Sequence, residues 1–280
     1  NENGFRKVRT WKELNNNVNK IVNFFKSIKI KEKDRVAAYL PNLIETVESF
    51  ISTSAIGAIW SSCSPDFGIK GINDRLGQIS PKILITVNAY QYNGKEHDCL
   101  TKIREVSKLI PSIEAVYVVS FTKTEIEFKG KEKPWAELLD YSVNTTIFAQ
   151  LPFDHPLYIL YSSGTTGLPK SIVHGAGGCL LKHLTEHRYH SDINPGDRLF
   201  YFTTCGWMMW NWLVSSLASG ATIILYDGAP TFPDTGRMWE LIDDQQITHF
   251  GTSPKYLGAV NKAGYSPKKN NQLNSLKAIL

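Results

Sequence analysis

The sequence predicts an α/β protein with two mainly parallel sheets flanked by helices. Apolar, β-branched runs alternate with amphipathic helical segments along nearly the whole chain, which is the pattern of repeated βαβ units. The 280 residues are 42% hydrophobic and 20% charged, a composition that can fill the cores of one large domain or two smaller ones. A disordered tail or a small adaptor is therefore not expected.

Residues 1–150 form the first expected block. Apolar residues recur at helical spacing between Trp11 and Ile28, and Arg35–Leu40 has the composition of a buried strand that Pro41 ends. Residues 121–153 hold a charged stretch and two prolines, and they are expected to connect this block to the next. Between these parts the same rhythm predicts helix 43–51, strand 58–60, helix 69–79, strand 82–87, helix 99–109 and strand 115–120.

Residues 151–280 form the second expected block. Gly220 is expected as the left-handed residue that ends a helix. Because the chain begins without Met and stops on a strand pattern, we expect truncation at both ends. The elements expected here are strands 157–162 and 171–174, helix 179–189, strand 199–203, helix 208–219, strand 221–226, helix 237–245, strand 248–251, helix 255–263 and the start of a strand at 275–280.

Charge and cysteine usage restrict the possible partners. The 31 basic and 26 acidic residues give a net charge of +5, and they are interspersed, so nucleic-acid binding is not expected. The uncharged segment 199–226 is rich in Ser, Thr, Asn and Gly, which fits buried core and not a membrane span. A signal peptide pattern is absent from residues 1–20. The widely spaced thiols predict a reduced, cytoplasmic (cytosolic) protein: Cys63, Cys99, Cys179 and Cys205.

The segment Tyr161–Ser171 carries the clearest chemical signal. It reads Tyr-Ser-Ser-Gly-Thr-Thr-Gly-Leu-Pro-Lys-Ser and directly follows an expected strand. Glycines let main-chain N–H groups approach oxygens, hydroxyls donate hydrogen bonds, and the Lys170 ammonium supplies charge, so the composition suits phosphate. The spacing of Gly164 and Gly167 does not match a Walker A loop. The β-branched residues after Lys170 predict a strand, so the segment is expected to join two strands.

This segment resembles the phosphate-loop signature of the acyl-adenylate-forming superfamily. The resemblance implies the N-terminal large domain of an ATP-dependent acid:CoA ligase, with ATP, Mg²⁺ and coenzyme A as small-molecule partners and the small C-terminal domain absent. It favours acetoacetate as the acid, converted through an acyl-adenylate; the alternatives are a ligase for acetate or another short acid and a non-catalytic nucleotide-binding module. Without the family residues expected beyond Leu280, this piece alone is expected to be inactive or nearly so. Further similar patches are Arg35–Asn42, Gly57–Gly68, Gly206–Asn211, Gly220–Gly228 and Phe250–Ser253.

The same resemblance implies roles for individual residues. Thr165 and Lys170 are expected to act in catalysis, with Mg²⁺ near Thr165. The triphosphate is expected to contact Ser162, Ser163, Gly164, Thr165, Thr166, Gly167 and Lys170. The acyl pocket is expected from Gly206, Trp207, Met208, Asn211 and Thr252, and coenzyme A contacts from Ser64, Phe67 and Lys95.

Several of these residues also have plain structural interpretations. Asn211 or Trp207 could donate to the keto oxygen of a β-keto acid, and the sequence does not choose between them. Met208 and its neighbours Met209, Trp210 and Trp212 could instead pack in a helix. Thr252 could belong to a strand-end turn, and Lys95 could be a surface lysine.

One competing motif lies in the expected helix 179–189. His183-Leu-Thr-Glu-His187 matches the H-x-x-E-H pattern of some zinc hydrolases, because histidines four apart share a helix face. No acidic third ligand stands out downstream, so zinc is the minor alternative. His174 either borders the substrate cleft, as the resemblance implies, or packs at a strand end.

Overall fold

A computed structural model describes residues 1–142, 148–162 and 167–280. The chain packs as two compact units. Unit 1 contains residues 1–6, 91–96 and 180–280, and unit 2 contains residues 7–90 and 97–179. Each unit is described by itself below. The boundary near residue 150 that the sequence suggests stays a prediction.

Unit 2 contains a seven-stranded sheet with the order β7-β6-β3-β1-β2-β8-β9. Neighbouring strands are parallel, except that β8 and β9 pair antiparallel. The α/β class and the mainly parallel sheet are thus confirmed. The strands are β1 (Arg35–Tyr39), β2 (Ile59–Cys63), β3 (Ile83–Val87), β6 (Ala115–Val119), β7 (Glu132–Pro134), β8 (Pro156–Ser162) and β9 (Lys170–Gly175).

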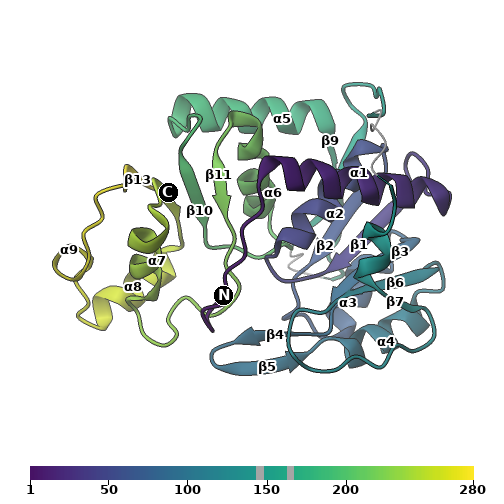
Figure 1. Ribbon diagram of the computed structural model, residues 1–280, viewed down its shortest axis with the longest axis horizontal. Coiled ribbons are helices and arrows are strands. Elements are labelled where there is room, and N and C mark those ends of the chain that lie inside the picture. Colours follow the sequence, from purple (N-terminus) through teal and green to yellow (C-terminus); the bar gives the residue numbers. More distant parts are fainter. Residues whose placement is uncertain (143–147, 163–166) are drawn as a thin grey trace. The chain divides into compact units, whose positions relative to one another are not determined.

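Right-handed crossovers decide which face each helix of unit 2 covers. The chain steps from β1 to β2 in one direction and from β2 to β3 and β6 in the other, so α2 covers one face and α3 and α4 cover the opposite one (Figure 1). Helix α1 packs against α2. Covered on both faces, β3 is buried at every residue. The helices are α1 (Trp11–Ser27), α2 (Ile44–Ala55), α3 (Ile69–Leu76) and α4 (Leu100–Leu109).

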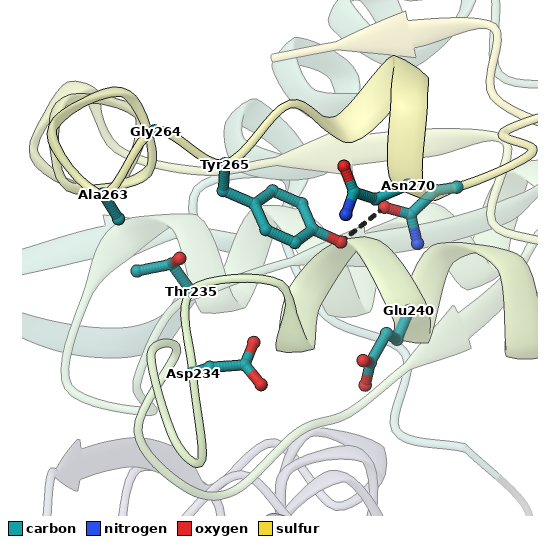
Figure 2. Close-up of a pocket in the computed structure, with 8 residues that line it drawn as sticks. Asp234, Thr235, Glu240, Ala263, Gly264, Tyr265 and Asn270 are labelled. Carbon is teal, nitrogen blue, oxygen red and sulfur yellow. Dashed lines mark hydrogen bonds between the residues drawn. The ribbon is translucent and has the colours of Figure 1, made fainter.

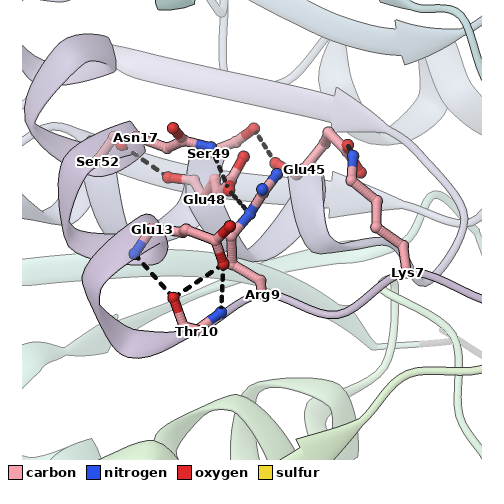
Figure 3. Close-up of polar contacts among 9 residues, drawn as sticks. All are labelled: Lys7, Arg9, Thr10, Glu13, Asn17, Glu45, Glu48, Ser49 and Ser52. Atoms are coloured by element: carbon pink, nitrogen blue, oxygen red, sulfur yellow. Dashed lines mark hydrogen bonds and ion pairs between the residues drawn. The ribbon is translucent and has the colours of Figure 1, made fainter.

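A polar network joins α1 to α2 (Figure 3). The Glu48 side chain is fully buried, and its Oε1 accepts hydrogen bonds from Arg9 Nε and Asn17 Nδ2, both at 2.8 Å. Burial raises the pKa of Glu48. At the start of α1, Thr10 and Glu13 form a capping box that satisfies two main-chain N–H groups. The buried carboxylate therefore ties the segment before α1 and α1 itself to α2.

Unit 1 contains a four-stranded parallel sheet with the order β11-β10-β12-β13. The sequence predicted its strands, and also Gly220, which ends the segment after α6 in the left-handed conformation with φ 76°. The elements are β10 (Arg198–Tyr201), α6 (Met208–Ser215), β11 (Thr222–Ile224), α7 (Arg237–Gln245), β12 (His249–Gly251), α8 (Pro254–Lys262), α9 (Pro267–Asn270) and β13 (Ala278–Ile279).

The two faces of this sheet bury different cores. Leu199 on β10 packs with Trp212 and Leu213 of α6, whereas Phe200 packs with residues of α7 and α8 on the other face. After β10 the chain passes through α6 to β11 on one side, while β12 lies on the other side of β10. The gap between the carboxyl ends of β10 and β12 is therefore a topological switch point, where α/β proteins commonly bind ligands.

The structure departs from the sequence prediction in several short elements. The 89–98 segment forms a hairpin of β4 (Ala89–Tyr92) and β5 (Lys95–Asp98), and the expected connector 121–153 contains β7 and a 3₁₀ helix, Trp135–Leu139. The helix expected at 179–189 is α5 (Ala176–Thr185) followed by a π-helix, Glu186–His190. The helix expected at 208–219 ends at Ser215 and continues as a 3₁₀ turn.

Candidate functional site

The segment 161–171, which resembles a phosphate loop, joins β8 to β9, and its two ends lie opposite each other on the β8–β9 ladder. Ser162 on β8 pairs directly with Lys170 on β9, so the structure brings together two residues that the sequence assigned to one site. Lys170 is exposed at its strand end, and Gly167 is also exposed. The other predicted phosphate-binding residues, Ser163, Gly164, Thr165 and Thr166, lie outside the described residues.

Gln78, just after α3, holds the β9 end of this segment. Its Nε2 donates to the Pro169 carbonyl at 2.8 Å, and its Oε1 accepts from the Ser171 hydroxyl at 3.0 Å. Both bonds link residues more than 90 positions apart, so only the tertiary fold brings them together. Sequence reasoning missed Gln78, since nothing in its local pattern marks it.

The loop after β2 contains two of the residues predicted for coenzyme A. Ser64 is buried, and the Phe67 ring packs under the Arg75 guanidinium at 4.1 Å from the ring centroid. The Tyr39 hydroxyl donates to the Phe67 carbonyl at 2.9 Å. Arg75 and Tyr39 thus anchor this loop. Lys95, the third predicted residue, is exposed on β5 and belongs to unit 1, whereas Ser64 and Phe67 belong to unit 2.

Three polar residues, two of them predicted site residues, lie on the segments that flank the switch point of unit 1. Thr204 follows β10, Asn211 is the fourth residue of α6, and Thr252 follows β12. Their hydroxyl Oγ1, amide Oδ1 and hydroxyl Oγ1 are buried, and each lacks a hydrogen-bond partner among the described residues. A buried polar atom left unpaired costs about 1–3 kcal/mol, so three such atoms beside a switch point make this region the candidate ligand site. Sequence reasoning did not include Thr204.

The side chains at the start of α6 differ in exposure. Trp207 is 63% exposed and Met208 45% exposed, so both remain accessible to a ligand. Trp210 and Trp212 are buried, and Met209 packs against the core cluster on the α6 face. Packing therefore accounts for these last three.

Asn211 presents an acceptor in this structure. Its Nδ2 donates to the Trp207 carbonyl at 3.4 Å, and its Oδ1 is the atom without a partner. A keto oxygen needs a donor. Rotation of the amide by 180° exchanges these two atoms, whereas the hydroxyls of Thr204 and Thr252 donate without such a change.

The H-x-x-E-H side chains bind the protein itself. His183 Nδ1 lies 2.8 Å from Ser215 Oγ, His187 Nε2 lies 3.1 Å from the Trp212 carbonyl, and Glu186 Oε2 accepts from Trp212 Nε1 at 3.0 Å. Across the ranges that the structure describes, no three His, Cys, Asp or Glu side chains cluster in a way that could hold a metal ion. The zinc alternative therefore has no geometric support.

His174 lies on β9 and packs against a neighbouring ring. Its imidazole is 5.0 Å from the Tyr158 ring, centroid to centroid, and burial lowers its pKa. The packed interpretation of His174 thus accounts for its position. In the part of the chain that the structure describes, no helix is both long and apolar enough to cross a membrane.

A hollow of about 490 Å³ in unit 1 contains none of the predicted site residues (Figure 2). Asp234 and Glu240 face it, and the Tyr265 hydroxyl beside it donates to Asn271 Oδ1 at 2.7 Å. It is wide and lined mainly by polar groups. The switch-point residues, with their unpaired buried atoms, are the stronger candidate.

Comparison with known proteins identifies the family of the chain. A family model described as AMP-binding enzyme matches residues 4–280. The chain belongs to the AMP-binding enzyme family.

Individual relatives in the AMP-binding enzyme family are similar over nearly the whole chain. The acetoacetyl-coenzyme A synthetase of Rhizobium meliloti (strain 1021) is 47% identical over 272 residues, which are 96% of this chain and 42% of the relative. The malonamoyl-CoA synthetase of Penicillium aethiopicum is 41% identical over 301 residues, covering 99% of this chain and 42% of the relative.

A solved structure shows the same fold. The acetoacetyl-CoA synthetase from Streptomyces lividans matches with a TM-score of 0.95 and 41% identity over 99% of this chain and 43% of that chain. The chain thus spans less than half the length of the relatives it matches.

Proposed function

We propose that this chain is the nucleotide- and acyl-binding portion of an ATP-dependent acid:CoA ligase whose acid is acetoacetate. The reaction joins acetoacetate, ATP and coenzyme A to give acetoacetyl-CoA, AMP and diphosphate through an acyl-adenylate. The observation that carries the proposal is the set of three buried polar atoms, Thr204 Oγ1, Asn211 Oδ1 and Thr252 Oγ1, that have no hydrogen-bond partner in the part of the chain that the structure describes. The acetoacetyl-CoA synthetases among the relatives support the choice of acid.

The chemistry of a β-keto acid fits this trio. The keto oxygen lies two carbons beyond the carboxylate and accepts hydrogen bonds, and the hydroxyls of Thr204 and Thr252 have free donor capacity among the described residues. Butyrate has the same length but no keto oxygen, so it leaves those hydroxyls unpaired. A site built to hydrogen-bond a substrate group rejects the analogue that lacks it, and we expect a loss of at least about 10²-fold in kcat/KM with butyrate.

Malonamate is the second candidate acid, because a relative is named malonamoyl-CoA synthetase. Malonamate carries an amide NH₂ where acetoacetate carries a methyl group. An amide N–H needs an acceptor, and the Asn211 Oδ1 atom is a buried acceptor with no partner among the described residues. Acetate and other short acids, which reach neither threonine nor Asn211 with a second polar group, are expected to be poor substrates.

At the phosphate end, the chain supplies a positive charge and hydroxyl groups. In adenylate formation a carboxylate oxygen attacks the α-phosphorus and diphosphate leaves, so negative charge grows on the leaving group. Lys170 is exposed and lies opposite Ser162 on the ladder, and we expect its ammonium to neutralise charge on the leaving diphosphate. Bound Mg²⁺ would supply further charge compensation, and the residue proposed beside it, Thr165, lies outside the described residues.

A substrate panel tests the proposed acid. In a full-length enzyme that contains this chain, ATP–diphosphate exchange should be fastest with acetoacetate, followed by malonamate, and at least about 10²-fold slower in kcat/KM with butyrate or acetate. Equal rates with acetoacetate and butyrate would refute the keto-oxygen contact. Faster exchange with malonamate than with acetoacetate would reassign the acid.

Substitutions at the phosphate loop test the ligase assignment. Lys170→Ala and Thr165→Ala should each slow ATP–diphosphate exchange by about 10²-fold or more, as expected when a group that stabilises transition-state charge is lost. Lys108→Ala removes an exposed lysine that pairs with Glu105 and serves as the control. Exchange that is unchanged in both loop variants would refute their role.

A further inference from the structure

The H-x-x-E-H segment surrounds one residue of α6, Trp212. The Trp212 indole N–H donates to Glu186 Oε2 at 3.0 Å, and the His187 ring meets the indole edge-on with centroids 4.5 Å apart. Glu186 is held in turn by Lys182 at 2.8 Å. Both Glu186 and His187 belong to the π-helix that follows α5, and π-turns occur frequently at functional sites.

The same segment satisfies a main-chain group that α6 leaves unpaired. Because α6 ends at Ser215, the Trp212 carbonyl is one of the last four in the helix and has no intrahelical N–H partner of the usual kind. It accepts from His187 Nε2 at 3.1 Å and from the Ser215 hydroxyl at 2.8 Å. The Ser215 oxygen accepts in turn from His183 Nδ1.

The histidine chemistry is consistent with this arrangement. A carbonyl can only accept, so His187 Nε2 must carry the proton, which leaves Nδ1 bare and buried. Burial lowers the pKa of His187 to about 4, and the ring is therefore neutral near pH 7. In this tautomer the ring donates to α6 without adding charge to the core.

Trp212 connects this network to residues on both sides of the switch point, on α6 and beside β12. It directly follows Asn211, whose Oδ1 is one of the three buried atoms that lack a hydrogen-bond partner among the described residues. Its indole also contacts the Tyr201 ring, with centroids 6.1 Å apart. The Tyr201 ring lies so close to Gly251 that a Cβ there would be 2.0 Å from Cδ2, and Gly251 precedes Thr252. Movement of Trp212 therefore displaces residues on the α6 side and on the β12 side together.

We propose that Glu186 and His187 are positioning residues that fix Trp212, and through it Asn211 and Thr252 at the proposed acid site. The inference rests on the proposed function for its activity readout, and it assigns the H-x-x-E-H segment a role in acid binding in place of metal binding. These residues act through α6 and do not contact the acid.

Steady-state kinetics of a full-length enzyme that contains this chain provide the first test. Trp212→Phe keeps an aromatic ring but removes the N–H donor, and Glu186→Leu removes its acceptor. Each should raise the KM for the acid by about tenfold, as expected for a lost hydrogen bond to a charged group, while the KM for ATP stays unchanged. Glu186→Gln retains an acceptor and should restore the acid KM. Trp239→Phe is the matched control, because Trp239 is also buried in unit 1 and its indole nitrogen has no partner among the described residues.

Equal effects of Trp212→Phe and Trp239→Phe would overturn the proposal, as would parallel increases in the KM for ATP and for the acid. Nuclear magnetic resonance of the 280-residue chain supplies a readout that does not depend on turnover. The Asn211 side-chain amide resonance should shift in Glu186→Gln less than in Glu186→Leu, and not at all in Trp239→Phe. Unshifted Asn211 in Glu186→Leu would refute the network itself. An inactive wild-type enzyme with a shifted Asn211 would refute the proposed function alone.

Discussion

The buried carboxylate of Glu48 leads to a sharp prediction about stability. Arg9→Met keeps much of the apolar length of the side chain but removes the guanidinium. The Glu48 side chain is 0% exposed, and its Oε1 would then retain a single donor, Asn17, while Oε2 already has no partner among the described residues. Removing one partner of a buried ion pair typically costs 3–5 kcal/mol. Because Arg9 itself is 19% exposed, we expect a loss of about 3 kcal/mol in the free energy of unfolding at pH 7.

Lys7→Met is the matched control on the same segment. Lys7 pairs with Glu45 at 2.6 Å, but the two side chains are 41% and 13% exposed. Solvent screens such a pair, so its loss should cost no more than about 1 kcal/mol. Both variants also remove one positive charge, which makes the comparison independent of net charge.

Acid and a second substitution separate an uncompensated charge from lost packing. Burial raises the pKa of Glu48, so the folded chain binds a proton there more readily than the unfolded chain does. The destabilisation by Arg9→Met should therefore shrink as the pH falls from 7 towards 5. Adding Glu48→Gln to Arg9→Met should recover most of the loss.

Urea unfolding followed by circular dichroism measures these differences. Equal losses for Arg9→Met and Lys7→Met would refute the reasoning. So would a double variant no more stable than Arg9→Met.

Three further outcomes follow from other contacts. Acidification from pH 7 to 5 should lower the free energy of unfolding by at most about 2 kcal/mol through His187. The pKa of His187 is lowered from 6.5 to about 4, so its stabilising contribution is complete above pH 6.5 and is lost as the pH falls towards 4. His187→Gln should lack this part of the pH dependence measured by urea unfolding. Gly251→Ala should lower the free energy of unfolding by about 1–3 kcal/mol, because the new Cβ would meet the Tyr201 ring. Gly258→Ala on α8 is the control: nothing lies within 4 Å of its new Cβ, so it should not be destabilising. The Cys63 thiol, fully buried and with its pKa raised by burial to about 12, should react with a thiol reagent only after denaturation, as mass spectrometry would show.

Hydrophobic periodicity identified most of the regular elements, because each long helix and each central strand buries apolar side chains at regular spacing. The elements that it missed are held by polar contacts or by turns instead. β7 is three residues long, and Glu132 in it is held by Arg104 through two hydrogen bonds of 2.7 and 2.9 Å, so no apolar pattern marks it. The hairpin of β4 and β5 did carry a signal, since Asn93 and Gly94 both have positive φ and this pair favours a tight hairpin turn.

The candidate site was predictable to the extent that its residues lie near one another in the chain. Ser162 and Lys170 end two strands that one short segment joins, so their pairing follows from the local pattern. Gln78 and Thr204 could not be found in this way. Gln78 reaches the loop across more than 90 residues, and the importance of Thr204 depends on which strand lies beside β10.

The position of an unpaired polar atom in the topology determines what it indicates. Glu48 Oε2 lacks a partner among the described residues, yet the other oxygen of the same carboxylate accepts two hydrogen bonds, and the group joins α1 to α2. Thr204, Asn211 and Thr252 come from three separate segments, and all lie at the carboxyl ends of adjacent parallel strands or at the helix that follows. Three hydrogen bonds that no described residue makes cost several kcal/mol at this switch point. A polar acid that makes those bonds recovers that free energy on binding, which is why we propose Thr204, Asn211 and Thr252 as substrate-binding residues and give the Glu48 network a role in stability.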